Sequence, residues 1–383
     1  MKVHNLALVA AATLIFGAQG VAQSDNGLER ALTELNAGLT APAGSAGMAI
    51  GGDLRLKNAM TIGGSNKDWK SADVRARLNF DFNVNESVNA HIGTNVTEYW
   101  DNDAANVDTD ANLDNTSMET AYVTVANLLG DGGSFKIGRD YWTMGSGRIE
   151  GSDDWDAAPS TRSGAWYSNA GFSAWLLNDG ADGGGDDLGF AWDYAMAIPG
   201  MGDVALRPYY LVSAAGADGS TGFNSNGYGS EFTGSIAGFG LSGEFANDQD
   251  GGNAYAVETS IEVGMLNSLP GVDGGSLDMS FSKADADFGL AQGSGLHWGK
   301  AGYAAGGLGV WDTTNGEREV NSIGMSFSPM EGWNGGLSRF DVDGTASWNM
   351  HMGTTLAGAV DTAVYVADGD DGNSVWLTMS VNF

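Results

Sequence analysis

The final ten residues of the chain, SVWLTMSVNF, alternate between apolar and mostly polar side chains up to the last residue, Phe383. Side chains of a β-strand point alternately to its two faces, so this pattern predicts a strand between an apolar medium and a wet one. Soluble chains usually end in a few polar, disordered residues. The closing strand of a membrane barrel is instead a full wall element, with an aromatic residue at the membrane interface. The pattern therefore favours a membrane β-barrel over a soluble, secreted β-sandwich.

This ending resembles that of bacterial outer-membrane β-barrels, whose last strand typically ends in Phe with apolar residues at every second position before it. In those proteins the pattern is read by the barrel-assembly machinery. The resemblance implies a location in the bacterial outer membrane. It also implies two partners: outer-membrane lipid, and the assembly machinery through the strand that ends in Phe383.

The beginning of the chain has the features of an export signal. Lys2 precedes an apolar stretch from Leu6 to Phe16, and small residues precede a plausible cut after Ala22. No later segment is long and apolar enough for a helical membrane span. We expect a signal peptide at residues 1–22, a short periplasmic helix and linker at 23–45, and a barrel at 46–383.

Composition agrees with a barrel of short strands and excludes several other classes. Sixty glycines stand against six prolines, and there is no cysteine, which removes disulfide scaffolds and thiol chemistry. Because Lys2 leaves with the signal and no acid does, the mature chain carries 16 basic residues against 48 acidic ones, a net charge near −32. A nucleic-acid partner is excluded, since phosphate contacts need a basic surface.

After residue 46 there are seventeen runs in which apolar and polar residues alternate. The connections between these runs are alternately short and long, and the long ones are mostly acidic. This predicts an all-β, up-and-down antiparallel barrel, in which both chain ends lie on one side and the strand number is even. We expect eighteen strands, with the weak apolar stretch at 303–311 as the eighteenth. If the short pair around 162–178 is misread, the number is sixteen.

The first two runs place charged residues on the inner face. In GMAIGGDLRLK (47–57) and SADVRARLNFDF (71–82) the apolar residues occupy even positions, so odd positions face inward. A hairpin symmetric about residue 65 puts Arg55 opposite Arg75, which is repulsive unless an acid or an anion lies between them. The row is either a charge ladder that stiffens a wet wall or an electropositive band felt by a permeating anion. The charged residues in question are Asp53, Arg55, Lys57, Asp73, Arg75, Arg77 and Asp81.

Three arginines lie in strands further along the chain. Arg207 and Arg339 fall on the inward parity of their runs. Arg139 does not, and an arginine toward lipid costs roughly 2–4 kcal/mol near the midplane. We therefore expect a bulge at Gly138 that turns Arg139 inward.

The segment FKIGRDYWTMGSGRIEGSDDWDAAPSTR (135–162), together with GDLRLK and RARLNFDFNVNESVNAHI, resembles porin-type barrels of the alginate-export kind. In these a Gly-Arg strand leads to a loop with Gly-Arg, Gly-Ser and Asp-Trp. The resemblance covers the first third of the barrel and, loosely, the last three strands. It implies eighteen strands and arginines on the inner wall, to which this segment contributes Arg139, Arg148 and Arg162.

The sequence shows no pattern of catalytic residues. Outside the signal the only histidines are His91, His297 and His351, with no nucleophile, base and acid grouping along the sequence. The acidic stretch 108–119 matches the ligand spacing of a calcium loop, but Leu113 stands where that loop needs Gly. We expect no enzyme activity, no cofactor and no metal site.

The sequence thus predicts a porin: an outer-membrane channel for passive diffusion of small hydrophilic solutes, with anionic sugars or oligosaccharides as candidates. Alternatives are a polysaccharide-export channel of the alginate-export type, or a barrel with a blocked lumen that serves as a surface adhesin or envelope scaffold. A homo-oligomer is left open.

Overall fold

The computed structural model describes residues 47–62, 70–101, 116–144, 147–149, 161–178, 186–198, 202–213, 226–236, 239–249, 251–263, 274–289, 311, 313, 316–369 and 372–383. The expected signal peptide and periplasmic helix lie outside these residues, as does most of the 303–311 stretch. No helix in the described part of the chain is long and apolar enough to span a membrane.

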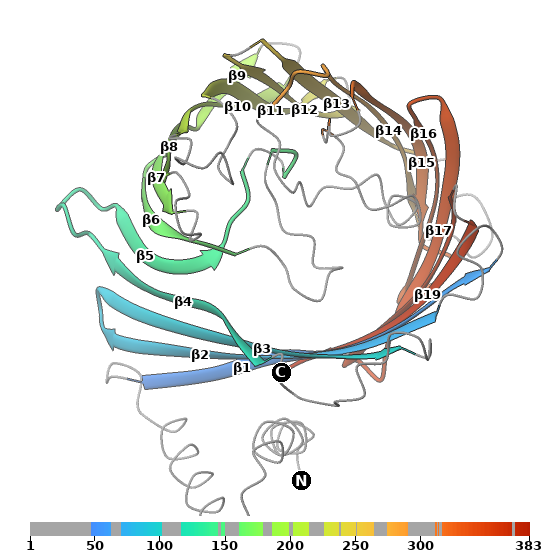
Figure 1. The fold of residues 1–383 in the computed structure, drawn as a ribbon, viewed down its shortest axis with the longest axis horizontal. Coiled ribbons are helices and arrows are strands. Elements are labelled where there is room, and N and C mark those ends of the chain that lie inside the picture. Colours follow the sequence, from blue (N-terminus) through green and yellow to red (C-terminus); the bar gives the residue numbers. More distant parts are fainter. Residues whose placement is uncertain are drawn as a thin grey trace, which may run out of the picture.

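The described residues form nineteen strand segments in one sheet (Figure 1). They are β1 (Gly47–Ile62), β2 (Lys70–Asn85), β3 (Val88–Asp101), β4 (Thr116–Ala126), β5 (Ser134–Tyr141), β6 (Thr161–Asn169), β7 (Phe172–Asn178), β8 (Asp186–Trp192), β9 (Tyr194–Ile198), β10 (Gly202–Ser213), β11 (Gly227–Ile236), β12 (Phe239–Asp248), β13 (Asn253–Glu262), β14 (Gly275–Ala284), β15 (Arg318–Phe327), β16 (Trp333–Val342), β17 (Thr345–Leu356), β18 (Val360–Gly369) and β19 (Gly372–Asn382).

The sheet closes into a barrel of eighteen wall strands. β8 and β9 both pair with β10 and are one strand interrupted at Asp193. β1 pairs with β19 from Asp53 opposite Asn382 to Ile62 opposite Asn373. Beyond that register Gly52 and Phe383 exchange backbone hydrogen bonds, each with a donor–acceptor distance of 3.0 Å. The predicted all-β antiparallel barrel of eighteen strands is confirmed, and the sixteen-strand alternative is wrong.

The eighteenth strand does not come from the expected place. β14 pairs directly with β15, so residues 303–311 cannot supply a wall strand between them. The count is reached because the run at 338–350, taken as one strand, is a hairpin of β16 and β17. Its turn contains only Asp343 and Gly344, both with positive φ. Such a two-residue turn leaves almost no interruption in an alternating pattern.

The connections singled out from the sequence lie at the expected ends of the barrel. The long interval 263–274 also lies at the end with the short turns, and the short connections 343–344 and 370–371 lie at the end with the long loops. The turns at 86–87, 127–133, 170–171, 237–238 and 357–359 all lie at the end where β1 begins and β19 finishes, which we call the turn end. Connections at the opposite end, the loop end, include the long intervals 102–115, 142–160, 214–226 and 285–317. The strand directions fix this assignment even where the connecting residues are outside the described part.

The wall is apolar outside and polar inside, the reverse of a soluble domain. Ile137, Leu176 and Ile323 are exposed on the outer face, while Arg75 and Glu244 are buried on the inner face. A monomeric soluble protein does not expose apolar side chains along most of its strands. In a membrane barrel these side chains face lipid.

The buried apolar cluster joins residues of the wall strands to chain segments outside the wall. After β5 the chain turns into the lumen, and Met144 and Ile149 of this inward segment pack with Trp166, Trp175 and Leu177 of β6 and β7. Figure 1 shows the described part of this segment within the ring of strands. The core thus fixes a piece of chain across the lumen.

Candidate functional site: the lumen wall and the inward segment

The β1–β2 hairpin has the register expected from its symmetry. Asp53 lies opposite Arg77, Arg55 opposite Arg75, and Lys57 opposite Asp73. Arg55 and Arg75 are 6% and 2% exposed, so two adjacent guanidinium groups are buried on one wall. The acid that such a pair requires is Asp53, whose Oδ2 accepts a hydrogen bond from Arg75 Nη2 at 3.2 Å.

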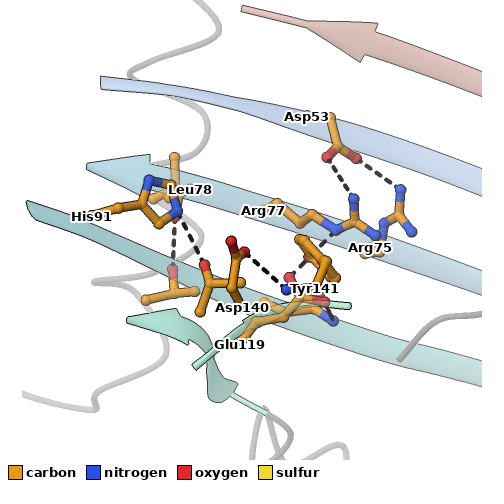
Figure 2. A network of polar contacts seen from close by, with 11 residues as sticks. Asp53, Arg75, Arg77, Leu78, His91, Glu119, Asp140 and Tyr141 are labelled. Carbon is orange, nitrogen blue, oxygen red and sulfur yellow. Dashed lines mark hydrogen bonds and ion pairs between the residues drawn. The ribbon is translucent and has the colours of Figure 1, made fainter. Parts of the chain in front are cut away.

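A second acid reaches this basic row from β4, two strands away from β2 (Figure 2). Arg77 Nη1 lies 3.7 Å from Asp53 Oδ1, and Arg77 Nε lies 3.4 Å from Glu119 Oε2. The Arg77 guanidinium also lies over the Tyr141 ring, with its Cζ 5.5 Å from the ring centroid. Glu119 faces inward because the β3–β4 register shifts at Gly93 and Thr94, which leaves Glu119 as the extra residue of a bulge. The row is therefore a mixed network in which two acids lie among the arginines.

Arg148 of the inward segment reaches the wall across the lumen. Its Nη1 lies 3.3 Å from Glu244 Oε2 on β12, and its Nη2 pairs with Glu258 on β13. Glu244 also accepts a hydrogen bond from the Tyr209 hydroxyl at 2.7 Å. Arg148 and Glu244 are almost completely buried, so this ion pair is little screened by solvent.

A second stretch of chain joins Arg148 inside the barrel. Trp311, from the long interval after β14, is fully buried, and its ring lies 6.0 Å from the Arg148 guanidinium. It packs edge-on against Phe288 at 5.6 Å. Arg148 thus connects three parts of the protein: the inward segment, the β12–β13 wall and the chain between β14 and β15.

The remaining inward residues of the prediction lie apart from these clusters. Lys57 is half-buried on β1, and Arg162 lies opposite Asp140 in the β5–β6 register. Arg207 is well exposed, 3.5 Å from Asp193 and 3.8 Å from Glu231. Asp81 is exposed near the turn end, where His91 pairs with it.

Two arginines expected inside lie on the outer face. Arg139 stands opposite Ala121 and Ser163, and its Nε donates to Thr161 Oγ1 at 2.7 Å. Gly138 has a positive φ of 139°, but the register on both sides runs through it without a shift, so the expected bulge is absent.

Arg339 stands opposite Ile323 and Trp348, both exposed outer-face residues. Its inward parity was inferred across the unrecognised turn between β16 and β17. For Arg139 the alternation itself gave the outward face, and the expected bulge was wrong. For Arg339 the alternation was continued across a turn that the pattern does not reveal.

A histidine cluster on the inner wall was missed. His91 Nδ1 lies 2.7 Å from Asp81 Oδ1, its Nε2 lies 3.0 Å from Thr120 Oγ1, and its ring stacks on Tyr122 at 4.7 Å. Acid, imidazole and hydroxyl are connected as in a hydrolase triad. Thr120, however, is only 2% exposed, and its hydroxyl lies where a Cβ on Gly93 would be, so a substrate cannot reach it. The cluster fixes the bulged β3–β4 pair.

The wall across from the basic row carries acids and hydroxyl groups. Figure 1 places β10–β13 on the opposite side of the barrel from β1–β3. Its inward carboxylates are Glu231, Glu244, Glu258 and, on β14, Asp278. The lumen therefore has a basic face and an acidic face. Alternation on the wall strands could have revealed the acidic face, because these residues share one parity.

Most of the acidic loop at 108–119 lies outside the described residues, and within the described part no group of three or more potential metal ligands is found. Glu119, the last position of the calcium-loop spacing, contacts Arg77 and Asn95 of the wall.

No family model and no curated protein matches the chain. Among solved structures it is similar to engineered porin variants of Rhodopseudomonas blastica. Two of these share 13% identity with it, with TM-scores of 0.46 and 0.47, and cover 88% of this chain and 100% of the porin. A third structure, described by its asymmetric conductivity, shares 14% identity with the same coverage and a TM-score of 0.47. Likeness at this level carries no argument, and the fold stands on the strand pairing given above.

Proposed function

We propose that the protein is a channel of the bacterial outer membrane through which small hydrophilic solutes diffuse passively. The observation that carries this proposal is the inversion of the barrel: apolar side chains outside, and charged and hydroxyl side chains inside. Such a wall suits lipid on one side and water with dissolved solutes on the other. Passage then depends on lumen width and on the charges that face the lumen.

The inward segment supports the channel as a size filter. Arg148 holds a short piece of chain against the β12–β13 wall, and the apolar packing of Met144 and Ile149 holds it against β6 and β7. A peptide segment fixed at both sides narrows the lumen without being part of the wall.

Anionic sugars or oligosaccharides are the finer proposal for the solute. Arg55 and Arg75 form a like-charge pair whose positive field favours an anion in the lumen. Both side chains are buried and Asp53 contacts Arg75, so this preference does not need direct contact with the pair. The same row would suit an acidic polysaccharide, as in the alginate-export type. A polymer needs a wider passage than a monomer, so solutes of graded size distinguish the two.

The experiment that tests the channel is single-channel recording of the purified, folded protein in a planar bilayer. We expect discrete conductance steps, and we expect vesicles that contain the protein to take up small sugars faster than large ones. Folding is checked by the heat-modifiable band on gels. A folded protein that gives no steps would contradict the channel. It would favour the adhesin or scaffold, in which Arg148 and Trp311 belong to a plug.

A further inference from the structure

The inner wall of β11–β16 contains a hollow of about 530 Å³, within the range of small-molecule sites. It exists because small residues follow one another on adjacent strands: Gly240 and Gly324 have no side chain, and most other inward positions carry a single hydroxyl group. The hydroxyl residues that line it are Thr233, Ser242, Ser260, Ser280, Ser322 and Ser338.

Two carboxylates face this hollow, and their surroundings differ. Glu258 is paired with Arg148 and accepts a weak hydrogen bond from Ser242 at 3.4 Å. Among the described residues, the hydrogen-bond donors to the Asp278 side chain are all serine hydroxyls. Ser260 donates to its Oδ1 at 2.6 Å, and Ser276 and Ser326 donate to its Oδ2 at 3.0 and 3.2 Å. Within the described residues no lysine or arginine pairs with Asp278, so its negative charge is not compensated there.

The directions of these hydrogen bonds decide what the hollow can bind. A serine hydroxyl has one proton to donate and two lone pairs. The serines around Asp278 use their protons on the carboxylate, and Ser280 and Ser322 share one between them at 2.6 Å. What remains toward the lumen is therefore mostly acceptor capacity beside an anionic group. A ligand that fits must supply several N–H or O–H donors and a positive charge.

Asp278 also lies between two hollows of the inner wall. Its partners Ser276 and Ser326 line a second hollow of about 800 Å³ toward the turn end, which Glu262, Asn334 and His351 border as well. The two hollows thus meet at Asp278. Glu258, which lines the first hollow, pairs with Arg148 of the inward segment, and Ser260 and Asp278 continue the lining toward the turn end. The hollow therefore lies on the turn-end side of the narrowing.

We propose that this hollow is a binding site for a polyhydroxylated cation of the amino-sugar class, with Asp278 as the residue that holds the ammonium group and the serines as acceptors for its hydroxyl groups. This inference rests on the proposed channel function and names a second solute class for it, beside the anions proposed for the arginine row. The site is on the wall across from the arginines of β1 and β2, and it selects the opposite charge.

The test is equilibrium binding to the folded, full-length protein in detergent, followed by titration calorimetry. The probes are glucosamine at a pH where its amine is protonated, glucose as the neutral counterpart, and methylammonium as charge without hydroxyl groups. We expect glucosamine to bind about tenfold more tightly than either, since a hydrogen bond to a charged group is stronger than a neutral one. Equal affinities for glucosamine and glucose would overturn the proposal, and so would methylammonium binding as tightly as glucosamine.

Variants locate the site. Asp278→Asn keeps an acceptor for the serines and removes the charge, so it should abolish the preference for glucosamine. Ser322→Leu fills the hollow without changing charge and should weaken glucosamine and glucose alike. The matched control is Asp361→Asn, an inner-wall carboxylate of β18 that accepts from Thr355 at 2.7 Å away from the hollow. It should bind as the wild type does, and a loss as large as that of Asp278→Asn would contradict the site.

The binding test and the conductance test distinguish failure of the proposed site from failure of the proposed channel. A protein that conducts but does not prefer glucosamine refutes the site and leaves the channel intact. A protein that prefers glucosamine but gives no conductance steps refutes the channel and leaves the site.

Discussion

Arg148 and Glu244 meet at 3.3 Å between Nη1 and Oε2, although they are 96 positions apart in the sequence and belong to the inward segment and to β12. The first prediction concerns this pair. Arg148→Met should release the inward segment from β12 and raise the single-channel conductance. It also leaves Glu244 buried without its cation, which should lower the free energy of unfolding by roughly 3–5 kcal/mol.

The control for this prediction is Arg207→Met, because Arg207 makes looser contacts and is 44% exposed. Its effect on unfolding should be below about 1 kcal/mol. If Arg148→Met conducts as the wild type does, the apolar packing of Met144 and Ile149 alone holds the segment.

The second prediction concerns the seam of the barrel, where Phe383 and Gly52 exchange two backbone hydrogen bonds. Deleting Phe383 removes both bonds and the terminal ring, whereas Phe383→Leu removes the ring only. We propose that the assembly machinery reads the ring, so both variants should lose most of the heat-modifiable folded band in membrane fractions. After refolding in detergent, Phe383→Leu should recover and the deletion should be less stable. Normal membrane yield of both variants would contradict a role in assembly.

The β1–β2 hairpin could be predicted to the residue, because long alternating strands fix both the faces and the register. The Arg55–Arg75 pair and its neighbours Asp53 and Lys57 follow from symmetry alone. The turn at Asp343–Gly344 and the interruption at Asp193 could not be located this way. Neither breaks the alternation enough to be seen. Because the turn was missed, Arg339 was assigned to the wrong face of the wall.

The site was harder to predict than the wall. Arg148 was expected inside the barrel only through a family resemblance, and nothing in the local sequence indicates that it contacts Glu244 and Glu258. Such contacts depend on how an irregular segment folds across a lumen, which no periodicity describes. Asp278 was overlooked because a single carboxylate among serines is unremarkable until neighbouring strands bring those serines together.

The third prediction concerns topology. The turn at 127–133 lies at the turn end, with Gly132 exposed, and the strand directions place the 102–115 connection at the loop end. If the turn end faces the periplasm, a peptide tag at Asn112 should be labelled on intact cells, whereas one at Gly132 should need permeabilised cells. Labelling of Gly132 alone on intact cells would mean that the barrel is inserted the other way round.

The fourth prediction concerns pH. A hydrogen bond from the Tyr167 hydroxyl, followed by one from the Gly133 backbone amide, lowers the pKa of Asp131 in the β4–β5 turn. A lowered carboxyl pKa stabilises the folded state fully above the ordinary aspartate value, and this is lost as pH falls through the folded value. Tyr167→Phe should therefore unfold at a lower temperature than the wild type near neutral pH, and the difference should vanish in acid.

The measurement is thermal unfolding of the detergent-folded protein from about pH 7 to about pH 2. Tyr228→Phe is the control, since Tyr228 is an exposed outer-face tyrosine and no described residue pairs with its hydroxyl. A Tyr167→Phe difference that does not change with pH would assign the effect to the loss of the hydroxyl group itself rather than to the charge of Asp131.

The last prediction compares the basic row with the acidic loops. Arg75 and Arg77 are largely buried, so their field is weakly screened, whereas exposed loop charges are screened over about 8–10 Å at physiological salt. Changing Arg75 and Arg77 to Ser leaves Asp53 and Glu119 without their cations and should shift the reversal potential toward cations. The matched variant neutralises Asp108, Asp110 and Asp114 to Asn and should shift it toward anions by less. If the loop variant gives the larger shift, the arginines only stiffen the wall and the acidic mouth governs passage.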